Sequence, residues 1–368
     1  MSLSEVARED LVRMASSLDD VFAEMSGRDL LITGGAGFLG YYLVQAPLEW
    51  NRLNPDREPI RVAVYDNFFR GRPLWLDDLN DEPHLTVDAY DLRDPLPDDM
   101  GDFDFYVHAA GIASPRYYRL HPIETMDANI SGLRSLLDHV VSQSGRKPAR
   151  GFLFFSSSEI YGDPPPYQIP TPETYRGNVS CTGPRACYDE SKRYGETLCV
   201  NFAQVHDLPV TMARPFNNYG PGMKITDGRV IADFARNIVA GENIVMHSDG
   251  SPTRTFCYAT DAVSGYFRVL VLGKPGEPYN VGTTDPEISM ADLAVMMTDV
   301  AADELGYGGQ VVRQASDEAD FLVDNPNRRC PDITKARAEI GYEPSVDLEE
   351  GLRRTIRWYA DNPEGDER

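Results

Sequence analysis

The sequence predicts an α/β protein built on a doubly wound parallel sheet, with a smaller lobe at its C-terminal side. Short apolar runs alternate with segments of helical periodicity along the first two thirds of the chain, and this alternation is typical of parallel sheets. A glycine-rich turn directly follows the first apolar run. The 368 residues, 42% of them hydrophobic, are enough to bury such a core.

The expected strands are short apolar runs that end in glycine or polar residues, as buried parallel strands do. Five have a clear signal: residues 29–33, 61–66, 103–107, 151–155 and 210–214. A sixth, residues 84–90, is weaker, and helical patterns such as residues 130–141 lie between the strands. Residues 51–59 are polar and lengthen the connection between the first helix and the second strand.

Three parts of the chain are expected from these patterns. Residues 1–27 form an N-terminal helical extension, residues 28–215 the dinucleotide-binding domain, and residues 216–368 mainly a substrate-binding lobe with a crossing back to the sheet. The extension has a stripe of apolar residues at helical spacing, which predicts docking on its own domain or on a partner subunit. The stripe consists of Leu11, Met14, Leu18, Phe22 and Met25.

Composition excludes several classes of function. A net charge of −23 repels phosphate backbones and anionic lipid surfaces, so neither nucleic acid nor a membrane is expected as a partner. The five cysteines are odd in number and contain no CxxC pair, which predicts a reducing, cytoplasmic location without structural zinc and no metal site. No apolar run is long enough for a signal peptide or a membrane span.

A GxxGxxG pattern of Gly34, Gly37 and Gly40 lies between the first strand and a helix. Such a turn lets the backbone approach a pyrophosphate closely, and the positive end of the helix then faces the phosphates. Glycine-rich turns are common, but this position between strand and helix predicts a Rossmann-type dinucleotide site. Phe38 and Leu39, within the same turn, are expected to contact the cofactor.

Acidic residues after the next two strands refine this prediction. A carboxylate at Asp66 would bond the ribose 2′-OH and repel a 2′-phosphate, which favours NAD over NADP. Its distance from Gly40 is longer than usual because of the polar stretch at 51–59. Asn67 is expected at the same site. Asp91 could bind the adenine amino group, or it could be a solvated loop carboxylate.

Tyr188 and Lys192 have the YxxxK spacing that puts both side chains on one face of a helix. A lysine ammonium beside a phenol favours the phenolate, so Tyr188 could act as a base near neutral pH. Because YxxxK matches arise by chance in many proteins, an ordinary surface pair is the default for the motif alone.

Two other segments strengthen the case for a chemical site. Ser157, Ser158 and Glu159 follow a predicted strand at the carboxyl edge of the sheet, where ligands bind in such folds, although a helix-capping turn is the alternative. Arg254 has few carboxylates nearby in the sequence, which favours an anion-binding role over a surface salt bridge.

Taken together, these motifs resemble the extended short-chain dehydrogenase/reductase superfamily, and are most similar to the UDP-glucuronate decarboxylases, or UDP-xylose synthases. The resemblance runs from about residue 28 to residue 360. Its most specific segments are residues 34–40, 66–72, 113–117, 157–164, 183–193, 214–221, 227–230, 329–333 and 341–352.

The resemblance implies roles for the central residues. Tyr188 would take the proton from the sugar 4-OH while hydride passes to NAD, Lys192 would hold the nicotinamide ribose, and Ser157 would bond the reacting oxygen. Glu159 matches a position used for positioning or proton handling at sugar C5.

Other matched positions concern the substrate. Arg254 and Ser158 would contact the carboxylate or assist its departure, Arg229 would help hold the nucleotide diphosphate, and Asn217 would also bind the substrate. The chain would thus convert UDP-glucuronate to UDP-xylose and act as a homodimer, as members of the superfamily commonly do.

Three alternatives remain open from the sequence. The 4,6-dehydratases of the superfamily usually have Asp-Glu where this chain has Ser158-Glu159, and the 4-epimerases usually lack the glutamate. A sensor that binds NAD without chemistry is a third possibility, but such a protein would need neither Tyr188 nor Lys192.

Overall fold

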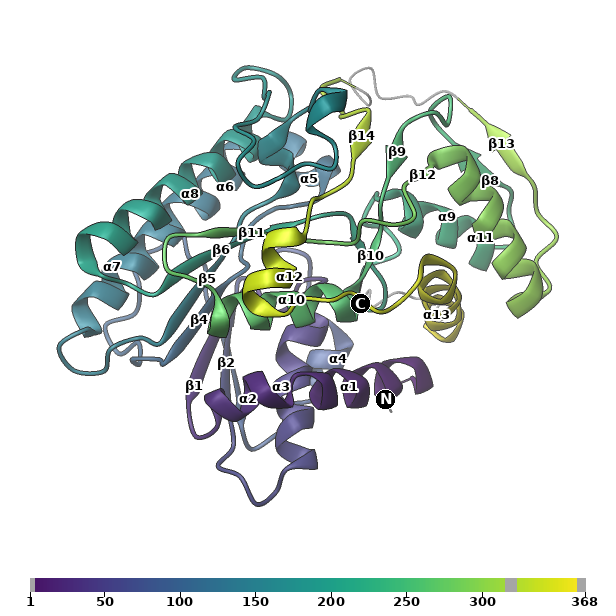
Figure 1. Ribbon diagram of the computed structural model, residues 1–368. Coiled ribbons are helices and arrows are strands. Elements are labelled where there is room, and N and C mark those ends of the chain that lie inside the picture. Colours follow the sequence, from purple (N-terminus) through teal and green to yellow (C-terminus); the bar gives the residue numbers. More distant parts are fainter. Residues whose placement is uncertain (1–3, 315–322, 363–368) are drawn as a thin grey trace.

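The computed structural model describes residues 4–314 and 323–362 and confirms the predicted α/β fold (Figure 1). The first three residues of the predicted extension, and residues 315–322 and 363–368 of the predicted lobe, lie outside the described residues. Within the described ranges, no helix combines the length and apolar character that crossing a membrane requires.

A seven-stranded parallel sheet forms the centre of the protein, in the order β11-β6-β5-β4-β1-β2-β3. The strands are β1 (Asp29–Thr33), β2 (Arg61–Asp66), β3 (Leu85–Ala89), β4 (Phe105–His108), β5 (Gly151–Phe155), β6 (Val210–Pro215) and β11 (Pro278–Val281). All six predicted strands are present. The fourth starts two residues later than predicted, and β11 brings the late chain back beside β6.

Helices cover both faces of the sheet, because successive strand residues point to opposite sides. Leu30 and Ile32 face α3 (Gly40–Leu53) and α10 (Ala259–Leu272), whereas Leu31 faces α7 (Leu133–Gln143) and α8 (Ala186–His206). The predicted helix at 130–141 instead begins as the π-helical turn η1 (Ala128–Gly132), and α3 includes the first three residues of the predicted 51–59 connection.

The other elements are short or belong to the lobe to the right of the sheet in Figure 1. Those near the sheet are α4 (Leu74–Asp77), α5 (Pro115–Leu120), α6 (Pro122–Asp127), η2 (Ser158–Tyr161), η3 (Pro166–Gln168) and α12 (Thr334–Ile340). The lobe contains α9 (Val230–Val239), α11 (Met290–Leu305) and α13 (Leu348–Asp361) around an apolar core of its own. Its strand pairs and small sheet are β7 (Asn218–Tyr219) with β10 (Cys257–Tyr258), β8 (Ile244–Met246) with β13 (Val311–Arg313), and β9 (Thr253–Arg254) between β12 (Ile288–Ser289) and β14 (Arg328–Arg329).

The N-terminal extension is two helices, α1 (Glu5–Ser17) and α2 (Asp19–Met25), where the sequence predicts one. Leu18 leaves helical geometry between them, with φ −108° and ψ 15°, yet the predicted apolar stripe continues across the break and is buried. The extension packs on α3 and α10, so it docks on its own chain.

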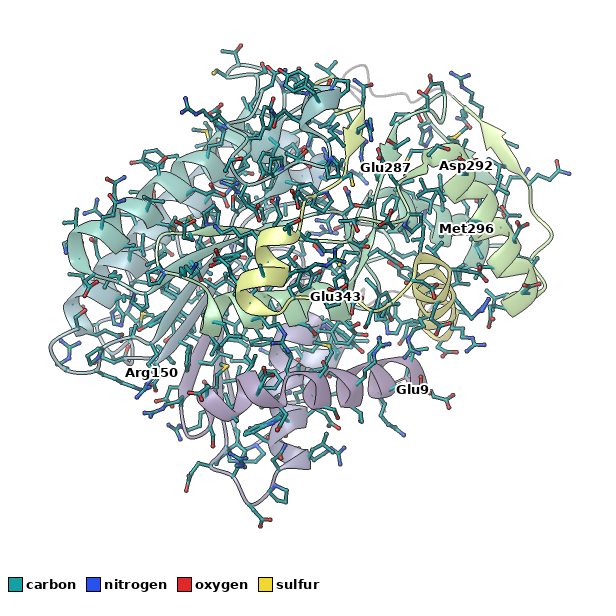
Figure 2. All side chains as sticks on the ribbon, viewed as in Figure 1. Glu9, Arg150, Glu287, Asp292, Met296 and Glu343 are labelled. Carbon is teal, nitrogen blue, oxygen red and sulfur yellow. The ribbon has the colours of Figure 1, made fainter. Side chains whose placement is uncertain are left out.

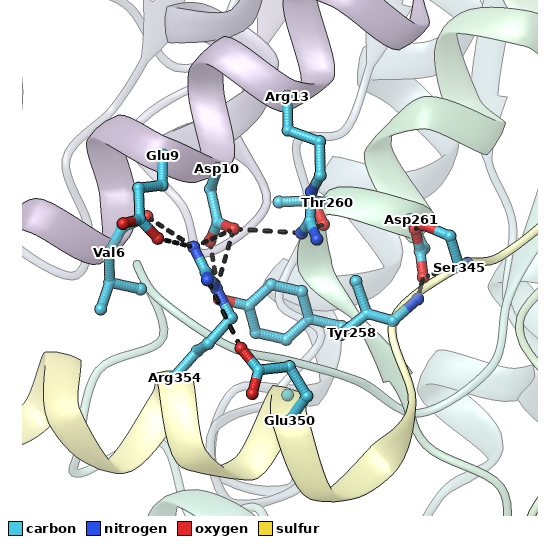
Figure 3. A network of polar contacts seen from close by, with 12 residues as sticks. Val6, Glu9, Asp10, Arg13, Tyr258, Thr260, Asp261, Ser345, Glu350 and Arg354 are labelled. Carbon is cyan, nitrogen blue, oxygen red and sulfur yellow. Dashed lines mark hydrogen bonds and ion pairs between the residues drawn. The ribbon is translucent and has the colours of Figure 1, made fainter.

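A buried carboxylate fastens this extension to three other elements (Figure 3). Asp10 accepts hydrogen bonds of 2.6 Å from the hydroxyls of Tyr42 on α3 and Tyr258 on β10. Arg354 on α13 and Arg13 donate to its other oxygen, both at 3.1 Å. Because α3 starts at the glycine turn and α13 lies in the lobe, Asp10 links the N-terminal extension to both the central sheet region and the lobe.

We predict that Asp10→Ala destabilises the protein by about 3–5 kcal/mol, because it leaves two buried hydroxyls and a guanidinium without their shared acceptor. Asp20→Ala is the matched control: Asp20 is an exposed carboxylate of α2 paired with Arg268, and its loss should cost about 0–1 kcal/mol. Denaturant unfolding measures both, and equal effects of the two substitutions would contradict the bracing role of Asp10.

Candidate active site

A cavity of about 940 Å³ opens at the carboxyl edge of the sheet and extends to the lobe. Eleven arginine and lysine side chains line it, against six carboxylates, in a protein of net charge −23. The excess acid lies elsewhere on the surface, for example at Glu9 on α1 and Asp292 on α11 (Figure 2). The cavity therefore favours an anionic ligand of considerable size.

At one end of the cavity, the glycine turn brings bare backbone to the surface. Gly34 has φ +75°, and a Cβ there would lie 2.6 Å from the backbone of Ala110. At Gly40, the first residue of α3, a Cβ would lie 2.0 Å from the carbonyl oxygen of Gly35. Only glycine fits these two positions, and Gly37, Phe38 and Leu39 line the cavity between them.

Asp66 and Asp91 both line this end of the cavity, in different environments. Asp66 accepts hydrogen bonds from the backbone N–H of Ala36, at 2.9 Å, and of Phe68, at 2.8 Å, and its burial raises the pKa of its carboxyl group. It thus ties the glycine turn to the end of β2. Hydrogen bonds from Arg93 hold the pKa of Asp91 well below its ordinary value, and Asn67 Nδ2 donates to Asp91 at 3.0 Å.

Tyr188 and Lys192 lie on the first turns of α8, buried beneath the middle of the cavity. The side chain of Ser157, which follows β5, forms a hydrogen bond with the Tyr188 phenol. Lys192 Nζ donates to the carbonyl oxygen of Phe155 at 2.8 Å and lies 5.7 Å from the centre of the Tyr188 ring. The structure therefore brings together the three residues that the sequence grouped from separate segments.

The burial of this pair opposes the predicted effect of Lys192 on Tyr188, which stays a prediction. Burial raises the pKa of the Tyr188 phenol to about 12, which is above and not below its usual value. The same burial lowers the pKa of Lys192 to about 7, so the ammonium charge itself is disfavoured here. Desolvation is the largest cause of both shifts, and Nζ of Lys192 bonds a neutral carbonyl instead of a charged partner.

Glu159 lies at the inner end of the cavity between two arginines. Its Oε2 accepts hydrogen bonds from Nη2 of Arg185, just before α8, and from Nη2 of Arg329, on β14, the latter at 2.5 Å. Burial opposes ionisation of Glu159, but the charges of Arg329, Arg185 and Arg254 outweigh it and hold its pKa below the ordinary value. Glu159 is therefore an anion held in place by cations.

Arg254 on β9 is buried beside this pair. Its guanidinium donates to the main-chain oxygens of Thr253 at 2.7 Å, Asn327 at 3.0 Å and Pro326 at 2.5 Å. Burial, followed by repulsion from Arg329, lowers its pKa to about 9. Neutral carbonyls orient this cation without cancelling its charge, so it remains a strong attractor for an anion.

The other predicted substrate residues line the same cavity. Ser158 is buried in η2 beside Ser157. Asn217 has φ 40° and donates from Nδ2 to the carbonyl oxygen of Thr255 at 2.9 Å. Arg229, at the start of α9, pairs with Asp227 at 3.2 Å, and its guanidinium lies 5.8 Å from the centre of the Phe38 ring. Arg229 thus connects the glycine-turn end with the lobe.

Sequence reasoning missed four residues of the inner end: Arg185, Arg329, Asp189 and Tyr118. The ring of Tyr118, on α5, stacks on Tyr188 with centroids 5.1 Å apart and planes 12° apart. Arg185 precedes Tyr188 by three residues, and Arg329 lies in one of the specific segments. These positions could have marked both arginines as site candidates, but the sequence does not show that they pair with Glu159.

The chain matches a known protein family and several proteins of that kind over most of its length. The model of the NAD dependent epimerase/dehydratase family matches residues 30–282. UDP-glucuronic acid decarboxylase 5 from Arabidopsis thaliana is 36% identical over 327 residues, which cover 89% of this chain and 88% of that protein. UDP-glucuronic acid decarboxylase 1 from Xenopus tropicalis is 36% identical over 92% of this chain and 73% of its own length.

Solved structures show the same architecture. A dTDP-glucose 4,6-dehydratase from Streptomyces venezuelae, solved with NAD bound, has a TM-score of 0.77 and 26% identity and covers 91% of this chain and 98% of its own. A UDP-glucose 4-epimerase from Thermotoga maritima has a TM-score of 0.75 and 25% identity over 91% of this chain and 99% of its own. The chain belongs to the NAD dependent epimerase/dehydratase family.

Proposed function

We propose that the protein is an NAD-dependent decarboxylase that converts UDP-glucuronate to UDP-xylose and CO2. The observation that carries this proposal is the group of buried arginines at the inner end of the cavity, beside Tyr188 and Ser157. Among the described residues that line the cavity, Glu159 is the one carboxylate paired with Arg185 and Arg329, and Arg254 forms no ion pair of its own there. A sugar carboxylate would complete the charge balance there, and relatives named UDP-glucuronic acid decarboxylases support this substrate.

The residues at the glycine-turn end suit NAD. Gly34 and Gly40 leave no room for side chains, and the exposed turn leads into the N-terminus of α3, where a diphosphate is favoured. Asp66 offers a carboxylate for a ribose hydroxyl and would repel a 2′-phosphate. Asn67 and Asp91 lie on the same side, as expected for the adenosine half, and Lys192 lies at the middle of the cavity for the nicotinamide ribose.

The proposed chemistry starts at the sugar 4-OH. NAD, when bound, would supply a hydride acceptor that can take the hydride from sugar C4 and give it back. Tyr188 takes the hydroxyl proton, and Ser157 keeps the reacting oxygen in register with the phenol through the hydrogen bond that the two side chains share. The cationic form of Lys192 would stabilise the phenolate, so the phenol pKa of about 12 has to fall when ligands fill the cavity.

The 4-keto sugar is a β-keto acid, which loses CO2 readily. The bond between C5 and the carboxylate breaks, its electron pair passes into an enolate ending at O4, and a proton from solvent adds at C5. The hydride taken in the first step would then return to C4 while Tyr188 gives its proton back to O4, which restores the hydroxyl of UDP-xylose. Tyr188 and Ser157 donate toward O4 and stabilise the negative charge that develops there. Before CO2 leaves, Arg254 and Ser158 hold the sugar carboxylate and Glu159 positions C5. Arg229 and Asn217 bind the substrate on its nucleotide side.

We predict that the purified protein, given UDP-glucuronate and catalytic NAD, releases CO2 and forms UDP-xylose, as seen by NMR of the sugar. Tyr188→Phe should lower kcat by at least about 100-fold while NAD affinity stays within about twofold, because only the proton transfer is lost. Tyr167→Phe, at an exposed tyrosine, is the control and should behave as the parent protein.

The products distinguish the alternatives. UDP-galacturonate without CO2 would replace the proposal with a 4-epimerase, and a 4-keto-6-deoxy product from UDP-glucose or dTDP-glucose would replace it with a dehydratase. Full turnover by Tyr188→Phe would remove the tyrosine from its role.

The proposal includes a homodimer. Exposed apolar side chains occur on three helices that contact one another: Leu120 on α5, Ile123 on α6 and Val205 near the end of α8, with exposed fractions of 63%, 65% and 72%. We predict twice the chain mass by light scattering, and a single chain mass for Ile123→Glu, because a charge would enter the apolar contact. Val295→Glu, on the lobe, should leave the mass doubled; a parent protein of single chain mass would contradict the dimer.

The proposal also places the enzyme in the cytoplasm. All five cysteines are free in the structure, as suits a reducing compartment.

A further inference from the structure

The first turn of α8 places one buried arginine between two buried carboxylates. Arg185 donates from Nη2 to Glu159, while its Nε lies 3.8 Å from Oδ2 of Asp189, one turn further along. The side chains of Arg185 and Asp189 are 8% and 7% exposed. Glu159 and Arg185 line the cavity, whereas Asp189 lies behind them and does not.

Two polar atoms of this group have no hydrogen-bond partner among the described residues: Nε of Arg185 and Oδ1 of Asp189. Buried polar atoms are nearly always paired, and 3.8 Å is too long for a hydrogen bond. A small turn of the guanidinium would bring Nε to the Asp189 carboxylate, but the same turn would draw Nη2 away from Glu159. The two carboxyl groups therefore compete for one arginine.

We propose that Asp189 is a positioning residue, which acts through Arg185 on the placement of Glu159. With Asp189 neutral, Arg185 rests on Glu159. When Asp189 loses its proton to solvent, the new carboxylate attracts Arg185 and adds a negative charge directly behind the place where a sugar carboxylate is to bind. This inference rests on the proposed function, because it assigns Glu159 to the substrate side.

The charged surroundings of Asp189 agree with this competition. Glu159 on η2 and Asp324 before β14 are negative, whereas Arg185 at the start of α8 and Arg329 on β14 are positive. Burial, and then the charge of Glu159, raise the pKa of Asp189 to about 7, and the two arginines oppose that rise. Asp189 thus changes its charge within the range of pH in which an enzyme works.

The first test compares Asp189→Asn with the parent enzyme between pH 6 and pH 9, using UDP-glucuronate. Asparagine stays neutral, so the ratio of its kcat/KM to that of the parent should be near one at pH 6. The ratio should then rise by about tenfold by pH 8, because the parent enzyme loses the one proton of Asp189 over this range and the variant does not. Lys192 also titrates near pH 7, but it is present in both proteins and cancels in the ratio.

Glu190→Gln is the matched control, because Glu190 is the next residue of α8 but its side chain is 39% exposed and pairs with Arg193. Its ratio to the parent should stay constant over the same range of pH. A constant ratio for Asp189→Asn as well would overturn the inference, since a purely structural aspartate would not change the pH profile.

A second test needs no substrate. Between about pH 4, the ordinary value for Asp, and pH 7 the folded parent keeps a proton that the unfolded chain has lost, so its stability falls as pH rises and levels off above pH 7. The Tm of Asp189→Asn minus that of the parent should therefore increase from pH 5 to pH 7 and then level.

The two tests separate the inference from the proposed function. A Tm difference that does not change with pH would overturn the inference, whatever the substrate. A changing Tm difference together with no turnover of UDP-glucuronate would reject the proposed function and support the titration of Asp189 against Arg185.

Discussion

Parallel pairing of β1, β4, β5 and β6 is the constraint on which the rest of this structure depends. Because these strands run in the same direction, their carboxyl ends meet at one edge, and every loop that leaves them opens into the same cavity. The glycine turn follows β1, the serines and Glu159 follow β5, and α8 returns across the sheet with Tyr188 on its first turn. These segments are far apart in the chain, but each contributes at least one residue to the same cavity.

Buried charge is the second organising feature. Asp10 is held by two tyrosines and two arginines where α1 meets α3, β10 and α13, and Glu159 is held by two arginines at the carboxyl edge of the sheet. Removing an ion from water is costly, so each such group needs partners from elements that are otherwise separate. In the first case the partners brace the N-terminal extension against α3, β10 and α13. In the second they assemble a cationic end of the cavity that is not fully neutralised, which is where chemistry on an anionic sugar is proposed.

The sequence predicted what depends on local pattern. Apolar runs located six strands of the sheet, and the glycine spacing located the turn before α3. What the sequence did not reveal depends on tertiary contact or on desolvation. The stripe through Leu18 continues across a break between α1 and α2, so periodicity suggested one helix. Arg329 is 170 residues from Glu159, and no spacing rule joins them. The lowered pKa of Lys192 follows from burial, which the YxxxK spacing does not report. The structure places the predicted site residues around one cavity, adds Arg185, Arg329 and Tyr118 to its lining, and places Asp189 behind them.

The central claim is that Tyr188 and its neighbours oxidise and then reduce the same sugar carbon, with CO2 lost between the two steps. UDP-glucuronate carrying deuterium at C4 tests it most directly, with the isotope content of the product read by NMR and mass spectrometry. We expect UDP-xylose that retains deuterium at C4, because the hydride taken from C4 returns to C4 without exchange with solvent, and that takes one solvent hydrogen at C5. Loss of the label from C4 to solvent, or CO2 release without any change at C4, would contradict it.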